Sequence, residues 1–234
     1  GKPLFEMRRV SPPALKTVND NVNRLRSIFR WGTERGLVTG VAADLVAVRS
    51  LDRSKLEGAR DTEEVPPVDD GVFLATRAHL EKPLADLLTV LRLSGARPSE
   101  IRNMTPAEIM THGDDGKPLD VWLLVPTWHK NRHRRQPAVR YLNRECQRIL
   151  RPYLKGRAPD RCVFDAGEAA LACCDRRRAD RKTSMTPSAQ RQYDAAARDF
   201  KSGPYGKDAL NKAIRRACKR AGVPIWTAGQ CRHS

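Results

Sequence analysis

Aromatic residues make up only 6% of the 234-residue sequence, and no apolar run approaches the length of a membrane span. We find no secretory signal peptide and no lipidation motif. The six cysteines lack the paired spacing typical of metal ligands, and there is no convincing cluster of carboxylates. These absences argue against a membrane protein, a secreted disulfide framework and a metal centre. We therefore expect a cytoplasmic protein with reduced cysteines and no cofactor or metal.

Negative charge is also scarce. The sequence has 44 Lys and Arg but only 27 Asp and Glu, which gives a formal net charge of +17. Much of this excess lies between Arg176 and Arg220. A charge of this size attracts polyanions, so nucleic acid is the expected partner. A hydrophobic content of 40% is nevertheless enough for the core of one large domain or two modest ones.

The first periodic segment follows Thr17. Apolar residues recur there at steps of three and four, which predicts a helix with one buried stripe. Gly32 and Gly36 are expected to end this helix. A short apolar run from Val41 to Val48 follows, and residues 49–70 have the polar, Pro- and Gly-containing composition of a linker. The predicted stripe consists of Val18, Val22, Leu25 and Phe29.

The middle of the sequence predicts a buried helix followed at once by a second one. Residues from Leu84 to Leu93 are apolar on most sides, and Gly95 can supply the left-handed cap. Pro98 suits the first turn of a new helix, where its missing N–H is not needed. Arg97 is therefore expected at a helix N-terminus, where free backbone N–H groups favour an anion.

Two strands joined by a basic tip come next. They are expected at Val121–Pro126 and Ala138–Leu142, with Lys130 at or near the tip. Asn143 can cap a helix that extends to Tyr153. Residues 165–203 are polar and Arg-rich, and we expect an exposed insertion that is helical around residues 190–200.

A last amphipathic helix precedes the end of the sequence. Its apolar stripe runs from Leu210 to Ala221, and Gly222 and Pro224 are expected to stop it. Tyr193 and Tyr205 lie before or near this helix, and we interpret both as structural. Trp31, Trp122 and Trp128 are interpreted as packing residues.

Three basic residues stand apart because of their positions: Arg97 at a helix start, Lys130 on a hairpin and Arg232 near the end. Any one of them is more simply explained as a solvated surface charge. Together they match the needs of phosphodiester chemistry. Arginines bind the non-bridging oxygens as a planar fork and stabilise charge in the transition state. A lysine can lose a proton, so it can serve as general acid toward a leaving oxygen.

The same segments resemble the motifs of the tyrosine recombinases, the phage-integrase family. "LRLSGARPSEIRNMTPAEI" resembles the first arginine motif, in which a Gly-x-Arg-x-x-Glu segment opens a helix. "HKNRHRRQPAVRYL" is similar to the hairpin lysine region, and "WTAGQCRHS" to the His-x-x-Arg-His-Thr/Ser box. "TVNDNVNRLRSIFRWGTERGLV" resembles the last helices of the family's core-binding domain. The similarity covers most of the chain, with the motifs in the family's order.

The resemblance implies roles for individual residues. Arg97 and Arg232 would be the two catalytic arginines, and Lys130 the hairpin general acid. Glu100 would support the first arginine, and His233 would support the second. The implied DNA-binding residues are Arg132, His133, Arg134 and Arg135 at the hairpin tip, with Arg24 and Arg26 in the core-binding part.

Two departures from the family pattern matter. The first histidine of the box falls at Gly229, which has no side chain to donate or accept a hydrogen bond. The family's nucleophile, a tyrosine on a helix well after the box, would lie beyond Ser234. We therefore expect this chain to bind DNA without cleaving it.

The resemblance implies a mainly α-helical protein with a small antiparallel sheet. Residues 1–60 would be part of a helical core-binding domain with a linker to about residue 66, and residues 61–234 an incomplete catalytic domain. The implied activity is site-specific recombination of double-stranded DNA through a 3′-phosphotyrosyl intermediate, with the full-length protein a tetramer on two DNA sites and associated with the nucleoid. Two alternatives remain open: a catalytically inactive DNA-binding relic or regulator, and a type IB topoisomerase-like enzyme.

Overall fold

The structure is a computed structural model that describes residues 13–50, 52, 64–129, 138–199 and 202–233. The chain divides into two compact units, with the boundary after Val65. Most of the described residues are helical, and the strands form one three-stranded antiparallel sheet. The expected fold class, mainly helical with a small antiparallel sheet, is confirmed at this level. The two units are described separately below.

The first unit consists of α1 (Leu15–Glu34) and the 3-10 helix η2 (Gly40–Ala47), which pack against each other. The helix continues through Gly32 instead of ending there, and Gly36, with φ 67°, follows its end. Gly32 is buried, and a Cβ atom at this position would lie 2.7 Å from Cγ2 of Val38. Only glycine therefore permits this close approach of the returning chain.

The predicted apolar stripe of α1 is wrong at one position. Leu25 is 56% exposed. Arg26 is only half-exposed, and its Nε atom donates a hydrogen bond to the Val46 carbonyl at 3.1 Å. The reason is geometric, because Val22, Arg26 and Phe29 follow the i, i+4, i+7 spacing of one helix face. Arg26 thus joins α1 to η2, whereas Arg24 is exposed and donates to Asn21 of the same helix.

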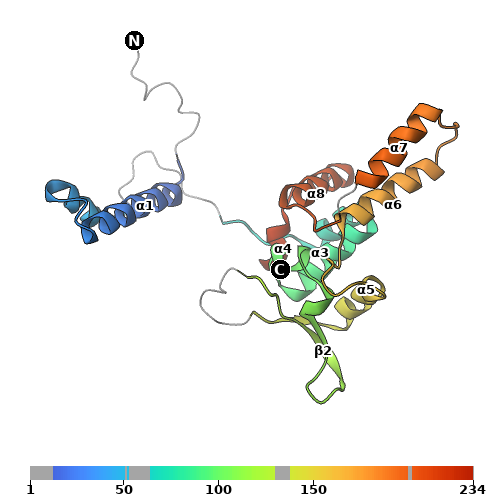
Figure 1. The fold of residues 1–234 in the computed structure, drawn as a ribbon, viewed down its shortest axis with the longest axis horizontal. Coiled ribbons are helices and arrows are strands. Elements are labelled where there is room, and N and C mark those ends of the chain that lie inside the picture. The colour runs from blue at the N-terminus through green and yellow to red at the C-terminus, as the bar shows by residue number, and fades with distance from the viewer. Residues whose placement is uncertain (1–12, 51, 53–63, 130–137, 200–201, 234) are drawn as a thin grey trace, which may run out of the picture. The chain divides into compact units, whose positions relative to one another are not determined.

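The second unit is built around α3 (Lys82–Ser94), as Figure 1 shows. Its core side chains Leu87, Val90 and Leu91 are fully buried. The helix packs against α5 (Arg144–Leu154), and α2 (Asp70–Arg77) packs against α8 (Lys207–Ala221). Three local predictions are confirmed: Gly95 has φ 59° after α3, Gly222 has φ 67° after α8, and the Asn143 side chain accepts from the Cys146 N–H at the start of α5.

The sheet has the order β1 (Ile109–His112), β2 (Pro118–Leu124) and β3 (Arg140–Leu142). The second and third strands correspond to the two predicted ones. The first was not predicted, because four residues with an exposed Met110 show no readable alternation. In the β2–β3 register Trp122 pairs with Leu142 and Leu124 with Arg140, so these four residues share the face that packs on the core.

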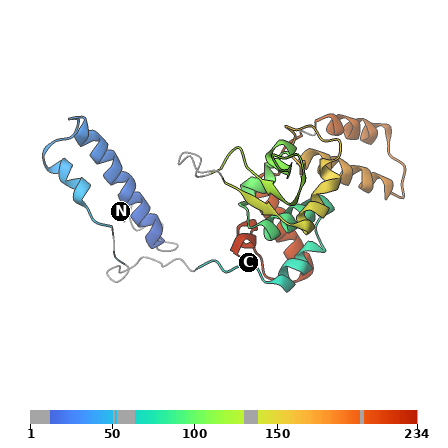
Figure 2. The ribbon, with the colours of Figure 1, turned by 90° about the horizontal axis from the view of Figure 1, so that it is seen from below.

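The polar insertion is more helical than predicted. It contains α6 (Ala166–Ala179) and α7 (Pro187–Asp199), which lie side by side in both views (Figures 1 and 2). Asp165 joins the beginning of α6 to the segment that follows α7. Its carboxylate accepts from the backbone N–H groups of Gly167 and Gly203 at 2.8 and 3.1 Å, and from the Ser202 hydroxyl. The insertion is therefore a helical hairpin joined to the rest of the second unit at its base, and Arg176 of α6 adds an ion pair with Glu81 at 2.6 Å.

Candidate functional site

The first wall of the site is the short helix α4 (Pro98–Arg102), which begins immediately after Arg97. Pro98 occupies its first turn, as predicted. Glu100 reaches back and accepts a hydrogen bond from the Arg97 backbone N–H at 2.9 Å. The same carboxylate accepts from Nη1 of Arg97 at 3.0 Å. The carboxylate of Glu100 thus holds both the backbone and the guanidinium of Arg97.

Glu100 has a second arginine partner that the sequence did not suggest. Nε of Arg140 donates to Glu100 Oε2 at 2.9 Å, and Nη2 donates to Oε1 at 3.1 Å. The Glu100 side chain is only 1% exposed, and that of Arg140 is 22% exposed. This bidentate pair fixes the carboxylate plane and joins strand β3 to the start of α4. Arg140 therefore positions Arg97 through a shared carboxylate.

One signal in the sequence could have indicated Arg140. It lies two residues before the buried Leu142, so the alternation of a strand directs it to the same face. A cation at an inward-facing position requires a buried anion. The strand pattern alone does not say which of the acidic residues supplies it.

These contacts predict a loss of stability in acid. Burial raises the pKa of Glu100, but the hydrogen bonds from Arg140 and Arg97 outweigh burial and hold the pKa below its ordinary value of 4.5. For Asp165, burial likewise raises the pKa, while the Ser202 hydroxyl and the backbone N–H groups hold it below 3.8. Because both values are lower in the folded state, the stabilisation is complete above the ordinary pKa values and disappears as the pH falls through the folded ones.

Urea unfolding between about pH 7 and pH 3 should therefore show a falling free energy of unfolding. Glu100→Gln should flatten this fall, because the group that titrates is gone. An unchanged pH profile in Glu100→Gln would contradict the assignment.

The second wall is the C-terminal segment that ends in the 3-10 helix η6 (Ala228–His233). Trp226 anchors it: the side chain is 3% exposed, and its Nε1 donates to Oγ1 of Thr76 at 3.0 Å. The Trp226 ring lies 5.8 Å from the Phe73 ring, centroid to centroid. Cys231 is fully buried, and burial raises the pKa of its thiol to about 12. Trp226, Ala228 and Cys231 thus anchor the segment in the core, while Gly229 and Arg232 remain exposed.

The third wall is the beginning of α8. Asn211 Oδ1 accepts from the Ala228 N–H at 3.2 Å, which joins α8 to η6. Arg102 donates to the carbonyl of Tyr205, which joins α4 to the residues just before α8. Tyr205 itself is half-buried, and burial raises the pKa of its hydroxyl to about 12.

These three walls enclose a pocket of about 610 Å³. It is lined by Arg97, which precedes α4, by Gly229 and Arg232 from η6, and by Arg102 and Lys207. In Figure 1 the 3-10 helix η6, drawn in red, accordingly lies close to α4. Three positions singled out in the sequence therefore meet in space, although Arg97 and Arg232 belong to distant parts of the chain.

The charge in this pocket has one sign. Four cationic side chains line it, and none of the described lining residues is acidic. Ser99, Asn211 and Thr227 add neutral hydrogen-bonding groups. A concave site of this kind stabilises an oxyanion, and two guanidinium groups can hold the non-bridging oxygens of a phosphodiester.

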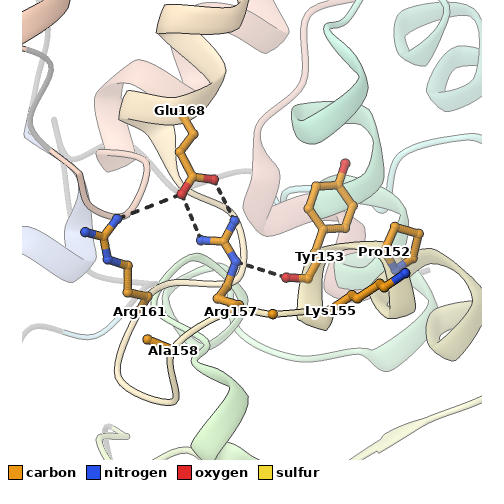
Figure 3. A pocket seen from close by; sticks show the side chains of 8 residues that line it. Pro152, Tyr153, Lys155, Arg157, Ala158, Arg161 and Glu168 are labelled. Atoms are coloured by element: carbon orange, nitrogen blue, oxygen red, sulfur yellow. Dashed lines mark hydrogen bonds and ion pairs between the residues drawn. The ribbon is translucent and has the colours of Figure 1, made fainter.

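A second basic pocket, of about 380 Å³, lies where the chain passes from α5 to α6 (Figure 3). It differs from the first pocket because an acidic residue, Glu168, lines it. Glu168 lies between Arg157 and Arg161 and binds Arg157 at 2.6 Å. Arg157, 13% exposed, also donates to the carbonyls of Tyr153 and Cys162 at 2.9 and 2.8 Å. The guanidinium of Arg157 is therefore already bound by other groups of the protein. We interpret this pocket as a structural contact between α5 and α6, without a free charge for a ligand at Arg157.

The other predicted site residues fall into three groups. Lys130, Arg132, His133, Arg134 and Arg135 fall outside the described residues. His233 is the last residue of η6. Arg24 and Arg26 belong to the first unit, and their predicted role in DNA binding stays a prediction; Arg26 also donates to the Val46 carbonyl.

The remaining tyrosines and tryptophans are only partly as predicted. The hydroxyl of Tyr193 donates to Asp175, a contact within the helical insertion. Trp122 is buried, but Trp128 and Trp31 are 65% and 51% exposed, so the prediction that they pack is wrong for both. All six cysteines are free, and Cys146, Cys218 and Cys231 are buried, as expected for packing residues.

Within the described ranges, no group of three or more His, Cys, Asp or Glu side chains is placed to hold a metal ion. None of the helices in the same ranges combines the length and the hydrophobicity needed to cross a membrane. Comparison with models of protein families found no match, and comparison with curated proteins found none either.

Proposed function

We propose that this chain contributes the phosphate-binding part of a tyrosine-type site-specific DNA recombinase. The observation that carries the proposal is the pocket lined by Arg97, Gly229 and Arg232, which are the positions of the first arginine, the histidine and the second arginine in the resemblance. A formal charge of +17 supports double-stranded DNA as the ligand. The tyrosine-recombinase catalytic fold and the partial core-binding domain belong to the same proposal.

In the proposed reaction the two arginines bind the non-bridging oxygens of the scissile phosphate. They neutralise the charge that grows as the phosphorus becomes pentacoordinate. The Glu100 contact keeps the Arg97 guanidinium in one orientation, so little reorganisation is needed when the phosphate enters. The attacking tyrosine would lose its hydroxyl proton to solvent and form a bond to phosphorus as the bond from phosphorus to the 5′ oxygen breaks, and Lys130 would donate a proton to that oxygen.

The first test measures DNA affinity with this chain itself. Fluorescence anisotropy with a labelled duplex should show an affinity that falls steeply with salt. Arg97→Ala and Arg232→Ala should each weaken binding and lower the salt slope by about one. Arg144→Ala is the matched control, because Arg144 is 88% exposed on α5 and lies outside the pocket. Equal effects of all three substitutions would contradict a special role for the pocket.

The second test concerns cleavage and uses a chain extended along its reading frame past Ser234. If the extension carries a tyrosine, a nicked suicide substrate should trap a covalent protein–DNA adduct. Arg97→Ala or Arg232→Ala should abolish the adduct. An adduct that survives Arg232→Ala would overturn the assignment.

Gly229 favours a second candidate function. A chain without the imidazole at this position could be a DNA-binding regulator or relic that does not cleave. The two candidates predict the same DNA affinity and differ in the adduct. A stop codon directly after Ser234 or an extended protein that forms no adduct would favour the regulator.

A further inference from the structure

We propose that Lys207 is a third cationic ligand of the phosphate in this pocket and takes the place of the side chain that Gly229 lacks. The inference rests on the proposed function, which supplies the phosphodiester. It adds a residue to the site that neither the sequence pattern nor the resemblance assigned. Four observations support it: the unpaired charge of Lys207, the free space beside Gly229, the fixed backbone position of Lys207, and the helix face on which Lys207 lies.

The first observation concerns the four cations that line the pocket. Arg97 is paired with Glu100, and Arg102 donates to the Tyr205 carbonyl. Lys207 and Arg232 are exposed, and neither makes a hydrogen bond or an ion pair with another residue of the described ranges. Lys207 and Arg232 thus have no competing partner among the described residues, so both charges are fully available to an incoming anion.

The second observation concerns Gly229. A Cβ atom built at this position would meet only Oγ1 of Thr227, at 3.9 Å, which is an ordinary van der Waals contact. The backbone there does not have the positive φ that favours glycine. Neither crowding nor backbone conformation requires a glycine, so this wall of the pocket has unfilled room for a side chain.

The third observation is the fixed position of the Lys207 backbone. Lys207 is the first residue of α8, and the buried Leu210 and Ile214 anchor this helix in the core. The Arg102 contact holds Tyr205, two residues earlier, against α4. The Asn211 contact with Ala228 holds the next turn of α8 against η6.

The fourth observation is the face on which Lys207 lies. Lys207 and Asn211 are four residues apart and therefore share one face of α8. Because Asn211 contacts the residue next to Gly229, this face looks toward the wall that has no side chain. A lysine stem is long and flexible, so its ammonium can reach an anion held between Arg97 and Arg232.

The chemical consequence differs from that of an imidazole. An ammonium offers three N–H donors and a full positive charge to the non-bridging oxygens, but it has no acceptor. Lys207 would thus restore binding and charge neutralisation at the phosphate. It would not restore an acceptor for the proton of an attacking hydroxyl.

The test uses the full 234-residue chain and a fluorescein-labelled DNA duplex, with anisotropy read over a series of salt concentrations. Lys207→Ala should weaken binding about fivefold and lower the salt slope by about one. Lys212→Ala is the matched control, because Lys212 is an exposed lysine of the same helix outside the pocket. It should change both quantities much less.

A double-mutant cycle shows whether the two cations share a phosphate. The effects of Lys207→Ala and Arg232→Ala should be non-additive, because each group compensates in part for loss of the other. Strict additivity would put Lys207 on a different phosphate and would overturn the proposal.

A rescue experiment tests the link to Gly229. In the Lys207→Ala background, Gly229→His should recover part of the lost affinity at about pH 6, where imidazole carries a charge, and less at about pH 8. No recovery at either pH would contradict the shared location.

The two proposals fail in different ways. If Arg97→Ala and Arg232→Ala weaken binding but Lys207→Ala matches Lys212→Ala, only the role of Lys207 is wrong. If all three pocket substitutions match Lys212→Ala, the proposed function itself is wrong.

Discussion

Arg140→Met is expected to lower the free energy of unfolding by about 3 kcal/mol, because it leaves the buried Glu100 carboxylate with one arginine instead of two. Arg97 would remain as the only ion-pair partner of Glu100 in the described ranges. DNA affinity should also fall, since an Arg97 guanidinium drawn fully to Glu100 is less available to a phosphate. Urea unfolding followed by circular dichroism measures the first effect, and anisotropy with a labelled duplex measures the second.

The control for this experiment is Arg148→Met. Arg148 also binds a glutamate, Glu145, but both side chains are exposed, and an exposed ion pair contributes little. Its loss should leave stability and DNA affinity nearly unchanged. The double substitution Glu100→Gln/Arg140→Met should be less destabilising than the sum of the single ones, because it removes both buried charges. Equal costs for Arg140→Met and Arg148→Met would contradict a buried, shared carboxylate.

Trp226→Ala is expected to have a comparable or larger effect, about 3 to 5 kcal/mol, because it empties a buried site between Phe73 and Thr76. The same change removes the anchor of the segment that carries Arg232. Limited proteolysis should therefore cut the C-terminal segment faster in the variant, under conditions in which the rest of the unit stays folded. Urea unfolding and mass spectrometry of the fragments together measure both consequences.

Two further variants separate the causes. Trp226→Phe keeps most of the ring but loses the N–H that Thr76 accepts, so it should cost about 1 kcal/mol. Trp128→Ala removes a tryptophan that is 65% exposed and should change stability little. A Trp226→Ala protein as stable as Trp128→Ala would show that Trp226 does not hold the segment.

Local features of the fold were readable wherever one residue decides the conformation. Gly95 and Gly222 adopt the left-handed conformation after α3 and α8, and Asn143 caps α5. Where several faces compete, the pattern misled: Leu25 fits an apolar stripe as well as Arg26 fits a polar one, yet Arg26 faces η2. Strand β1 was missed because it is too short to show a period.

The candidate site likewise has features that could be predicted from the sequence and features that could not. Its motifs could be recognised in the sequence because each is a short run of residues: Arg97 with Pro98 and Glu100 at a helix start, and Gly229 with Arg232 in the terminal box. The contacts of Arg140 and Lys207 could not be predicted, because a lone cation in a strand or at a helix start does not reveal which distant group it meets.

The sequence by itself thus determined a basic, mainly helical chain and the caps and stops at Gly95, Asn143 and Gly222, since these depend on neighbours within a few residues. Only the tertiary structure decided that Arg97, Gly229 and Arg232 line one pocket, that Glu100 is shared with Arg140, and that Lys207 faces the same space. The physical reason is that burial and charge pairing act between residues that packing brings together. The distance between two residues along the sequence does not indicate whether packing brings them into contact.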